Sequence, residues 1–213
     1  MDFAYEWARL DRRFRACVEQ AWISLGRRGL PVGAAVALGD QVVSLGRNRV
    51  YDPPGGPDPL QGTPIAHAEM NALASVPHDS DLARCSIWST HAPCAMCEAA
   101  IDFAGLGRVQ YLANDPSDEE PVASNRATVG DVSLWTVVAN AMFLHNVAWV
   151  GGRDNPIVAR YALLEPEIAR LALRLLDDRS FIRISSEGGD LSDALTAVWE
   201  SVVETNRGRL ARV

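Results

Sequence analysis

Residues 67–69 of the chain read "HAE" and residues 93–97 read "PCAMC". Cys94 and Cys97 are three positions apart, which puts both thiols on one face of a helix. A proline precedes them, and proline is favoured at a helix start, so both thiols fall in the first turn. There the helix dipole lowers the pKa of a thiol and favours the thiolate. Two thiolates at this spacing are half of a zinc site, and His67 is the natural third ligand.

Glu69 stands two positions after His67, and in mid-helix these two side chains would point roughly 200° apart. They can face one pocket only if His67 lies at the mouth of its helix, as Thr63 and Pro64 before it indicate. Three protein ligands leave the fourth position of a catalytic zinc to water, whose pKa falls to ~7. A carboxylate that is not a ligand can carry that water's proton to a leaving nitrogen. We predict that Glu69 is this proton shuttle.

Two other interpretations of the cysteines stay open. A lone C-x-x-C pair can be a redox pair, although nothing else in the chain is typical of a thioredoxin-like protein. The other alternative is a closed structural zinc site made of Cys85, Cys94, Cys97 and a histidine, which leaves Glu69 without a role. Cys17 lies in a helical pattern and Cys85 leads a strand-like run, so we interpret both as small buried hydrophobic residues.

The length and composition indicate one globular domain. A chain of 213 residues can bury a substantial core but is short for two domains. Hydrophobic residues make up 48% of it. The longest apolar run, residues 135–150, is interrupted by two asparagines and a histidine, so no membrane association is expected. The N-terminal segment has no signal-peptide core. We therefore expect a cytoplasmic protein.

The charge argues against nucleic acid as a partner. The formal net charge is −7, and every residue counted as lysine or arginine is an arginine. Proteins that bind nucleic acid through its phosphates usually show a basic surface. Arginine clusters at residues 12–15, 27–28 and 207–212 keep RNA binding open, although solvated helix faces explain them as well.

Hydrophobic periodicity predicts an α/β protein, with a sheet covered by helices on both faces. A proline- and glycine-rich loop at residues 49–64 and a polar surface insertion at 114–130 interrupt the pattern. The expected helices span residues 3–27, 66–76, 94–104, 131–145, 156–176 and 191–207. The expected strands span residues 32–38 and 41–46, which form a hairpin, then 86–90, 108–113 and a short 181–185.

Two segments, "IAHAEMNALA" (65–74) and "STHAPCAMCEAAI" (89–101), contain H-x-E followed by P-C-x-x-C, the pattern of zinc-dependent base deaminases. The match extends to the hairpin "PVGAAVALGDQVVSLGRNRV" (31–50) and the strand "GLGRVQYLA" (105–113). From about residue 30 to residue 115 the chain thus resembles the cytidine deaminase-like superfamily, through motifs that are highly specific.

The resemblance implies a zinc site and a set of substrate contacts. The zinc ligands that it implies are His67, Cys94 and Cys97. Glu69 is then the proton shuttle, Asn48 contacts the substrate, and Ala68 lends a backbone group to the pocket. Asp115 lies where some members of the superfamily hold an exocyclic amine. An aspartate before a proline is also a good turn residue, which is the alternative for Asp115.

One departure from the family pattern bears on the substrate. Many tRNA adenosine and guanine deaminases read T-L-E-P-C, whereas residues 90–94 read "THAPC", with His91 and Ala92 in place of leucine and glutamate. Some pyrimidine deaminases also lack that glutamate, so the chemistry is unaffected. We expect His91 to line the pocket and pair with the substrate. The alternative is a histidine outside the pocket.

We therefore expect a hydrolase that uses Zn²⁺ to deaminate a small amino-substituted heterocycle, a nucleobase, a nucleoside or an analogue, with release of ammonia. The alternatives are a tRNA adenosine deaminase and a non-catalytic, zinc-stabilised interaction module. The resemblance implies a three-layer α/β/α sandwich and a homodimer. We expect one deaminase domain over residues 1–213, with the catalytic core at about 1–115 and a C-terminal helical extension at about 131–213 that covers its own or a neighbour's active site.

Overall fold

The computed structural model describes residues 2–56, 58, 60–117 and 133–212. Within these ranges the chain forms one four-stranded sheet with the order β2-β1-β3-β4. The hairpin predicted around residues 39–40 is present, and its strand β1 also pairs antiparallel with β3, while β4 runs parallel to β3. The strands are β1 (Gly33–Leu38), β2 (Gln41–Arg47), β3 (Cys85–His91) and β4 (Arg108–Ala113).

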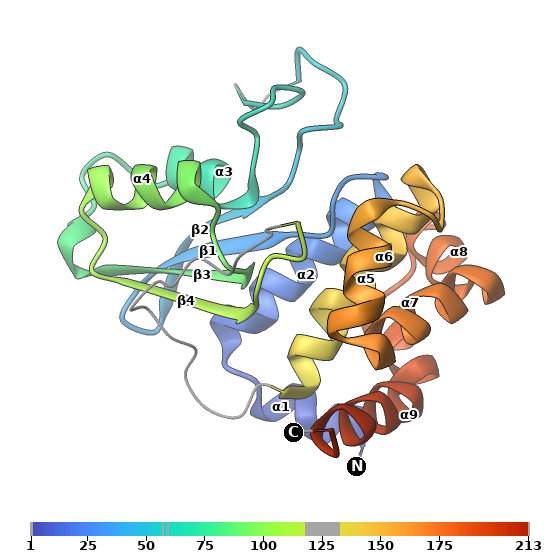
Figure 1. The fold of residues 1–213 in the computed structure, drawn as a ribbon. Coiled ribbons are helices and arrows are strands. Elements are labelled where there is room, and N and C mark those ends of the chain that lie inside the picture. Colours follow the sequence, from blue (N-terminus) through green and yellow to red (C-terminus); the bar gives the residue numbers. More distant parts are fainter. Residues whose placement is uncertain (1, 57, 59, 118–132, 213) are drawn as a thin grey trace.

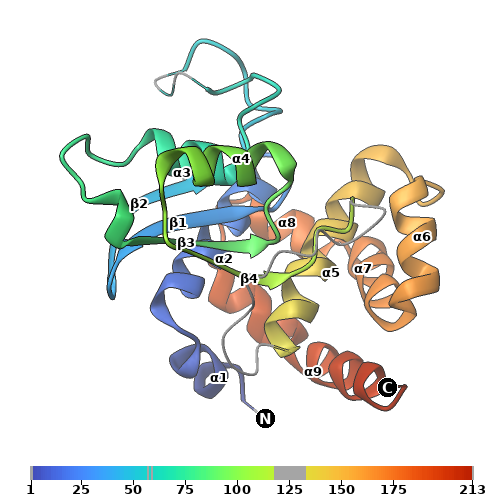
Figure 2. The ribbon, with the colours of Figure 1, turned by 60° about the vertical axis from the view of Figure 1, so that its left-hand side comes forward.

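Helices cover both faces of this sheet, as the sequence predicts (Figure 1). Side chains alternate between the faces along each strand, so Ala34 and Val36 join one core, whereas Ala35 and Ala37 join the other. Figure 2 shows α3 and α4 together above the sheet and α2 below it. These helices are α2 (Arg12–Gly26), α3 (Ala68–Ala74) and α4 (Ala95–Ala104), and α5 (Ser133–Gly151) packs on the same side as α2. The three-layer α/β/α fold is confirmed.

Two glycines let helices lie directly on the hairpin. A Cβ atom on Gly33 would lie 2.0 Å from the carbonyl oxygen of Cys17 in α2. One on Gly46 would lie 2.1 Å from the carbonyl oxygen of Ala68 in α3. Real Cβ atoms cannot approach backbone so closely, so only glycine permits this packing. The second contact sets the start of α3 against β2.

The extension consists of five helices where the sequence predicts three helices and a strand. They are α5, α6 (Pro156–Leu164), α7 (Pro166–Asp178), α8 (Ser180–Ser186) and α9 (Leu191–Leu210). The predicted helix 156–176 is split because Pro166 lacks an N–H group and begins a new helix. The predicted strand 181–185 is wrong. It is a helical turn that buries Phe181 and Ser185, at i and i+4, with the Phe181 ring 5.6 Å from that of Trp22.

Two further differences lie at the N-terminus and before β3. The predicted helix 3–27 is two helices, because the Asp11 carboxylate accepts the backbone N–H of Arg13 and starts α2 anew after α1 (Phe3–Arg9). A short 3₁₀ turn, η1 (Leu82–Arg84), leads into β3. Most of the predicted insertion at 114–130 lies outside the described residues. No helix in the described part of the chain is long and apolar enough to cross a membrane.

The extension shares one core with the sheet. Buried side chains of α2 and of the sheet contact those of α5, α7 and α9 in a continuous cluster, in which Phe14, Leu144, Leu171 and Leu195 are all almost fully buried. At the chain ends, the Phe3 ring lies 5.3 Å from that of Trp199, so α1 packs on α9. The helices after β4 are therefore held against the sheet by the same hydrophobic effect that holds the core together.

Candidate active site

The starts of two helices meet at one end of the sheet. His67 is the N-cap residue of α3 and Cys94 is the N-cap residue of α4, and both have an extended backbone. Neither side chain caps its own helix, so both are free to point toward each other. His67 thus lies at the helix mouth, as the sequence predicts. Cys97 follows in the first turn of α4 and is fully buried.

The three side chains form a cluster with the dimensions of a zinc site. Nδ1 of His67 lies 3.6 Å from the sulfur of Cys94 and 3.6 Å from that of Cys97. A tetrahedral zinc ion with ordinary Zn–S and Zn–N bonds holds a sulfur and a nitrogen about 3.6 Å apart. All three ligand atoms lie within 4.8 Å of one another, and no other such group is found among the described residues. The donor set therefore fits zinc without rearrangement.

The protonation of the thiols is consistent with metal binding. Hydrogen bonds from Cys97 and His67 lower the pKa of Cys94 to about 3, so this sulfur is a thiolate at neutral pH. The hydrogen bond to Cys94, together with burial, raises the pKa of Cys97. A divalent cation in the cluster would displace that proton, as it does whenever thiols become ligands. Cys85, the cysteine of the alternative closed site, lies at the start of β3, at the opposite end of the strand from His91, and is not part of the cluster, so that alternative has no geometric support.

Glu69 lies in the first turn of α3, beside the cluster. Its carboxylate oxygen Oε2 is 3.5 Å from the Cys97 sulfur, and the hydroxyl group of Ser89 donates a 2.6 Å hydrogen bond to Oε1. The side chain is buried, and burial raises the pKa of the carboxyl group, against the opposing effect of Ser89. A carboxylate in this position can hold a proton next to the metal site.

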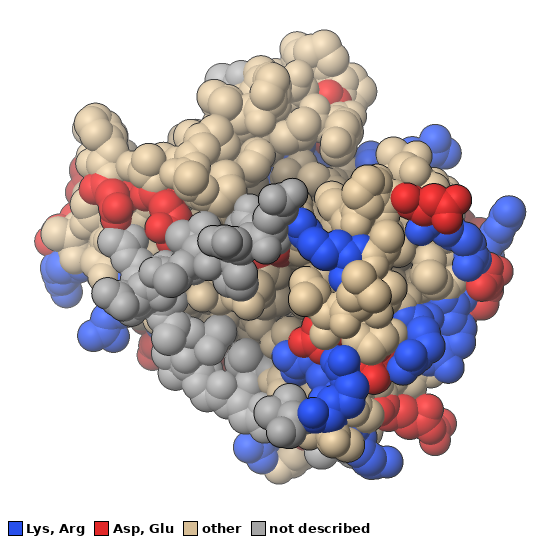
Figure 3. Space-filling model, in the orientation of Figure 1, with Lys and Arg blue, Asp and Glu red and all other residues tan. Residues whose placement is uncertain are grey.

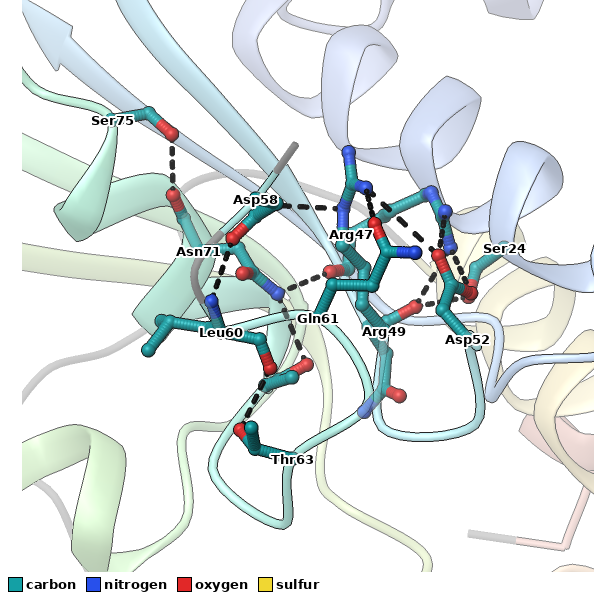
Figure 4. A network of polar contacts seen from close by, with 12 residues as sticks. Ser24, Arg47, Arg49, Asp52, Asp58, Leu60, Gln61, Thr63, Asn71 and Ser75 are labelled. Atoms are coloured by element: carbon teal, nitrogen blue, oxygen red, sulfur yellow. Dashed lines mark hydrogen bonds and ion pairs between the residues drawn. The ribbon is translucent and has the colours of Figure 1, made fainter. Parts of the chain in front are cut away.

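A buried asparagine fixes the loop that precedes α3. The side-chain amide of Asn71 donates hydrogen bonds to the carbonyl groups of Arg47 (2.9 Å), Ala66 (3.1 Å) and His67 (3.0 Å) (Figure 4). These bonds tie the end of β2 to the start of α3 and so hold His67 in its cap position. The sequence reasoning missed Asn71. Its only signal was a polar residue on the helix face that points toward the sheet.

Asn48 directly follows β2 and is held rigidly. Its backbone carbonyl accepts hydrogen bonds from the Ser24 hydroxyl (2.8 Å) and the Arg47 guanidinium group (3.2 Å), and its Oδ1 accepts the N–H of Val50 (3.2 Å). The guanidinium group of Arg47 in turn pairs with Asp52, and both of these side chains are buried (Figure 4). This network fixes the position of Asn48 relative to α3.

A cavity of about 340 Å³ opens above these residues, where β2 ends and the parallel strands β3 and β4 end. Every residue that the sequence predicts as a substrate contact lines it: Asn48, Ala68, His91 and Asp115. His67, Glu69 and Cys94 line it as well. Ligands commonly bind at the carboxyl ends of strands in α/β sheets, so the location is favourable.

His91 presents a neutral ring to this cavity. Burial lowers the pKa of His91 to about 4, so the imidazole is uncharged at neutral pH. Thr90 accepts the N–H of Gly33 and lies 3.1 Å from Nδ1 of His91, so its own hydroxyl hydrogen is available to Nδ1. The other ring nitrogen, Nε2, is buried and has no hydrogen-bond partner among the described residues. His91 is buried and lines the cavity, so a surface position is excluded, and its pairing with a substrate stays a prediction.

Asp115 both lines the cavity and forms a turn, the two alternatives that the sequence offers for it. It lines the cavity, and its carboxylate also accepts the backbone N–H (2.8 Å) and the hydroxyl group (2.6 Å) of Ser117, as in an Asx turn. The two functions are compatible, because the second carboxylate oxygen has no part in these bonds.

The wall opposite the zinc cluster comes from the extension. Phe143, Asn146, Val147 and Val150 of α5 line the cavity, and so does Ile157 of α6. The extension therefore forms a wall of the pocket of its own chain. The sequence did not decide between its own pocket and that of a neighbouring chain. The sequence reasoning did not identify these residues, because α5 is buried over consecutive residues from Val137 to Ala148 and no polar face marks its role.

The family model of the cytidine and deoxycytidylate deaminase zinc-binding region matches residues 9–113, which include the cluster and Glu69. This region of the chain belongs to the cytidine deaminase-like superfamily. Zinc is the metal of this family, and the histidine–cysteine cluster is compatible with it. The family assignment agrees with the fold, in which the two metal-bearing helix starts and the hairpin lie as the resemblance implies.

Individual relatives cover only part of the chain. It is 31% identical to a tRNA-specific adenosine deaminase of Agrobacterium fabrum over 97 residues, 44% of this chain and 59% of that enzyme. It is 29% identical to a tRNA-specific adenosine deaminase of Rickettsia bellii over 116 residues, 52% of this chain and 74% of that enzyme. The solved guanine deaminase of Nitrosomonas europaea shares the fold, with a TM-score of 0.51 and 24% identity over 65% of this chain and 85% of that one.

Proposed function

We propose that the protein is a zinc-dependent hydrolase that deaminates a small, uncharged amino-heterocycle and releases ammonia. The observation that carries this proposal is the placement of Glu69. Its carboxylate is buried, held by Ser89, and 3.5 Å from a sulfur of a cluster that fits zinc, at the wall of the cavity. A structural zinc site has no use for a buried carboxylate that is not a ligand, whereas a hydrolytic site needs one.

In this proposal each residue has a defined role. His67, Cys94 and Cys97 hold the zinc ion, which when bound supplies an acidified water molecule at neutral pH. Glu69 takes one proton from the attacking water and gives it to the ring nitrogen beside the amine-bearing carbon. It then takes the proton of the added hydroxyl group and gives it to the departing amino group. Water adds to that carbon, the C–N bond breaks, and the products are ammonia and the ring carbonyl compound. Asn48 and the backbone of Ala68 orient the ring.

The cavity favours a neutral substrate. Among its described lining residues none is an arginine, while Glu69 and Asp115 are both acidic. A phosphate group would therefore be repelled rather than paired. A cavity of about 340 Å³ is near the lower end of the usual size for ligand pockets. A free base or a nucleoside is thus favoured over a nucleotide.

A tRNA adenosine deaminase is the second candidate, because the two curated relatives carry that name. The chain's charge of −7 argues against it. Figure 3 shows arginines mixed with acidic side chains over the helices of the extension, not a continuous basic surface on that face. Incubation with tRNA and assay of inosine separates the two candidates, because the small-molecule enzyme forms none.

We also propose a cytoplasmic homodimer. The family resemblance supports the dimer, and sedimentation at several concentrations tests it. The thiol pair at the site supports a reducing compartment, because an oxidising one would convert two adjacent cysteines into a disulfide.

The decisive experiment is an ammonia-release screen over cytosine, guanine, adenine, their nucleosides and triazine analogues. Glu69→Gln is the matched control, because it keeps the shape of the side chain and removes its titratable proton. We expect the variant to keep its zinc and to lose at least ~10²–10⁴-fold in turnover. Ammonia release by the variant at the wild-type rate, with zinc intact, would falsify the mechanism. No release from any compound would leave the zinc-stabilised interaction module as the better description.

A further inference from the structure

Asn146 is a polar side chain on the cavity wall that takes no part in the proposed mechanism. Asn146 of α5 lines the cavity and is only 2% exposed. Its Nδ2 atom is buried and has no hydrogen-bond partner among the described residues. A buried amide without a partner loses the hydrogen bonds that it makes with water in the unfolded chain, so buried amides are nearly always bonded. An amide that is unpaired at a ligand cavity is placed to bond the ligand.

The depth of Asn146 indicates which part of a ligand it meets. Val150, one helical turn later on the same wall, is 67% exposed, and Tyr51 on the facing loop is 64% exposed. These two residues mark the mouth of the cavity. Phe143 and Val147, beside Asn146, are 3% and 8% exposed and form a deep apolar wall. Asn146 therefore meets the heterocyclic ring, whereas a sugar would lie toward the mouth.

We infer that Asn146 selects heterocycles with a lactam edge, in which a ring carbonyl group stands next to a ring N–H group. A carboxamide has one acceptor oxygen and two donor hydrogens, so it pairs with such an edge through two hydrogen bonds. No charged residue is needed for this pairing, in agreement with the uncharged deep wall. The inference rests on the proposed function, because it assigns a substrate edge that does not include the ring nitrogen protonated by Glu69.

Two pairs of compounds test this selection. Cytosine and 4-aminopyrimidine share an amine-bearing carbon next to a ring nitrogen, and only cytosine has the lactam edge. Guanine and 2-aminopurine differ in the same way. We expect Asn146→Leu to lower the ratio of kcat/KM for the lactam compound over its partner by about 10- to 100-fold relative to wild type. The two compounds of a pair differ in intrinsic reactivity, but this difference is the same for wild type and for Asn146→Leu, so it cancels when their ratios of kcat/KM are compared.

Asn206→Leu is the matched control, because Asn206 is also a buried asparagine, bonded to Ser133 and outside the cavity. It should leave the ratio unchanged. Asn146→Asp keeps the shape and removes the donor hydrogens, so it should lower the ratio even if the leucine variant folds poorly. If folded Asn146 variants keep the wild-type ratio of kcat/KM for the lactam compound over its partner, the inference is overturned. It is also overturned if the variants change only the preference between a base and its nucleoside.

A binding assay separates failure of the inference from failure of the proposed function. Zinc-loaded Glu69→Gln protein, with and without Asn146→Leu, is titrated calorimetrically with the four bases. If wild type releases no ammonia from any of them, the deaminase proposal fails for these bases. Tighter binding of the lactam compounds, lost with Asn146→Leu, then still supports the inference. Equal binding within each pair, or no binding at all, overturns it.

Discussion

Ser89 donates a 2.6 Å hydrogen bond to Oε1 of Glu69, and both side chains are buried. The serine lies on β3 and the glutamate on α3, so this bond links the sheet to the helix that begins at the metal cluster. It holds one carboxylate oxygen, while the other lies 3.5 Å from the Cys97 sulfur. The bond thus fixes the orientation of the group that the proposed mechanism uses to move protons.

Ser89→Ala should lower kcat by about 10- to 100-fold, because a hydrogen bond to a charged group contributes about 1.5–3 kcal/mol. Zinc content should stay at the wild-type level, since the three proposed ligands are untouched. Ser44→Ala is the control, because Ser44 is a buried serine of β2 whose hydroxyl group donates to the backbone carbonyl of Ala72 and does not contact Glu69. Equal kcat values for the two variants would show that Ser89 does not position Glu69.

Zinc content should separate the four cysteines into two classes. Cys94→Ala and Cys97→Ala should each lose the metal, and His67→Ala should do the same, because each removes one of the three clustered donors. Cys17→Ala and Cys85→Ala should retain about one zinc per chain. Elemental analysis of the purified proteins is the measurement. Retention of zinc by all three cluster variants contradicts the site.

The buried ion pair between Arg47 and Asp52 should be far more important for stability than an exposed one. Their side chains are only 2% and 3% exposed, so Asp52→Ala leaves an unpaired buried guanidinium group and should cost about 3–5 kcal/mol in urea unfolding. Asp177→Ala is the control, because the side chains of Arg153 and Asp177 are 49% and 66% exposed, so their pair should contribute no more than ~1 kcal/mol. Similar losses in both variants would contradict this assignment.

His145 should make the protein less stable in mild acid. It is fully buried, close to the rings of Trp149 and Phe181, and both of its ring nitrogens lack hydrogen-bond partners among the described residues. Burial lowers its pKa from 6.5 to about 4, against the opposing effect of Asp178. The unfolded chain therefore binds a proton before the folded one does. The contribution of the neutral His145 ring to the free energy of unfolding is therefore fully present above pH 6.5, and it is lost as the pH falls toward about 4.

The measurement is urea unfolding across this pH range, in which His145 accounts for roughly 3 kcal/mol. His145→Phe should flatten the profile, although His91, whose pKa burial also lowers to about 4, contributes in the same window. A profile with the same slope in the variant and in wild type would show that His145 is not the titrating group.

The sequence by itself determined the metal cluster and its glutamate. His67, Cys94 and Cys97 could be predicted because the rules that place them are local: a helix start exposes its first turn, and the spacing within that turn decides which side chains converge. The hairpin and the positions of the four strands along the chain followed from equally local periodicity. Prediction failed where local signals were absent or ambiguous, as at Pro166 and at residues 181–185.

The tertiary structure alone decided what surrounds the cluster. Ser89 reaches Glu69 across 20 residues of sequence, and Asn146 reaches the same cavity from the extension. Alternation along a strand shows which side chains share a face, but it does not show which helix covers that face. In α5, burial on all sides removes even the helical periodicity that would mark the wall facing the cavity. The proposed catalytic group is therefore encoded in a short motif, whereas the shape and polarity of the pocket follow from contacts between segments far apart in the chain.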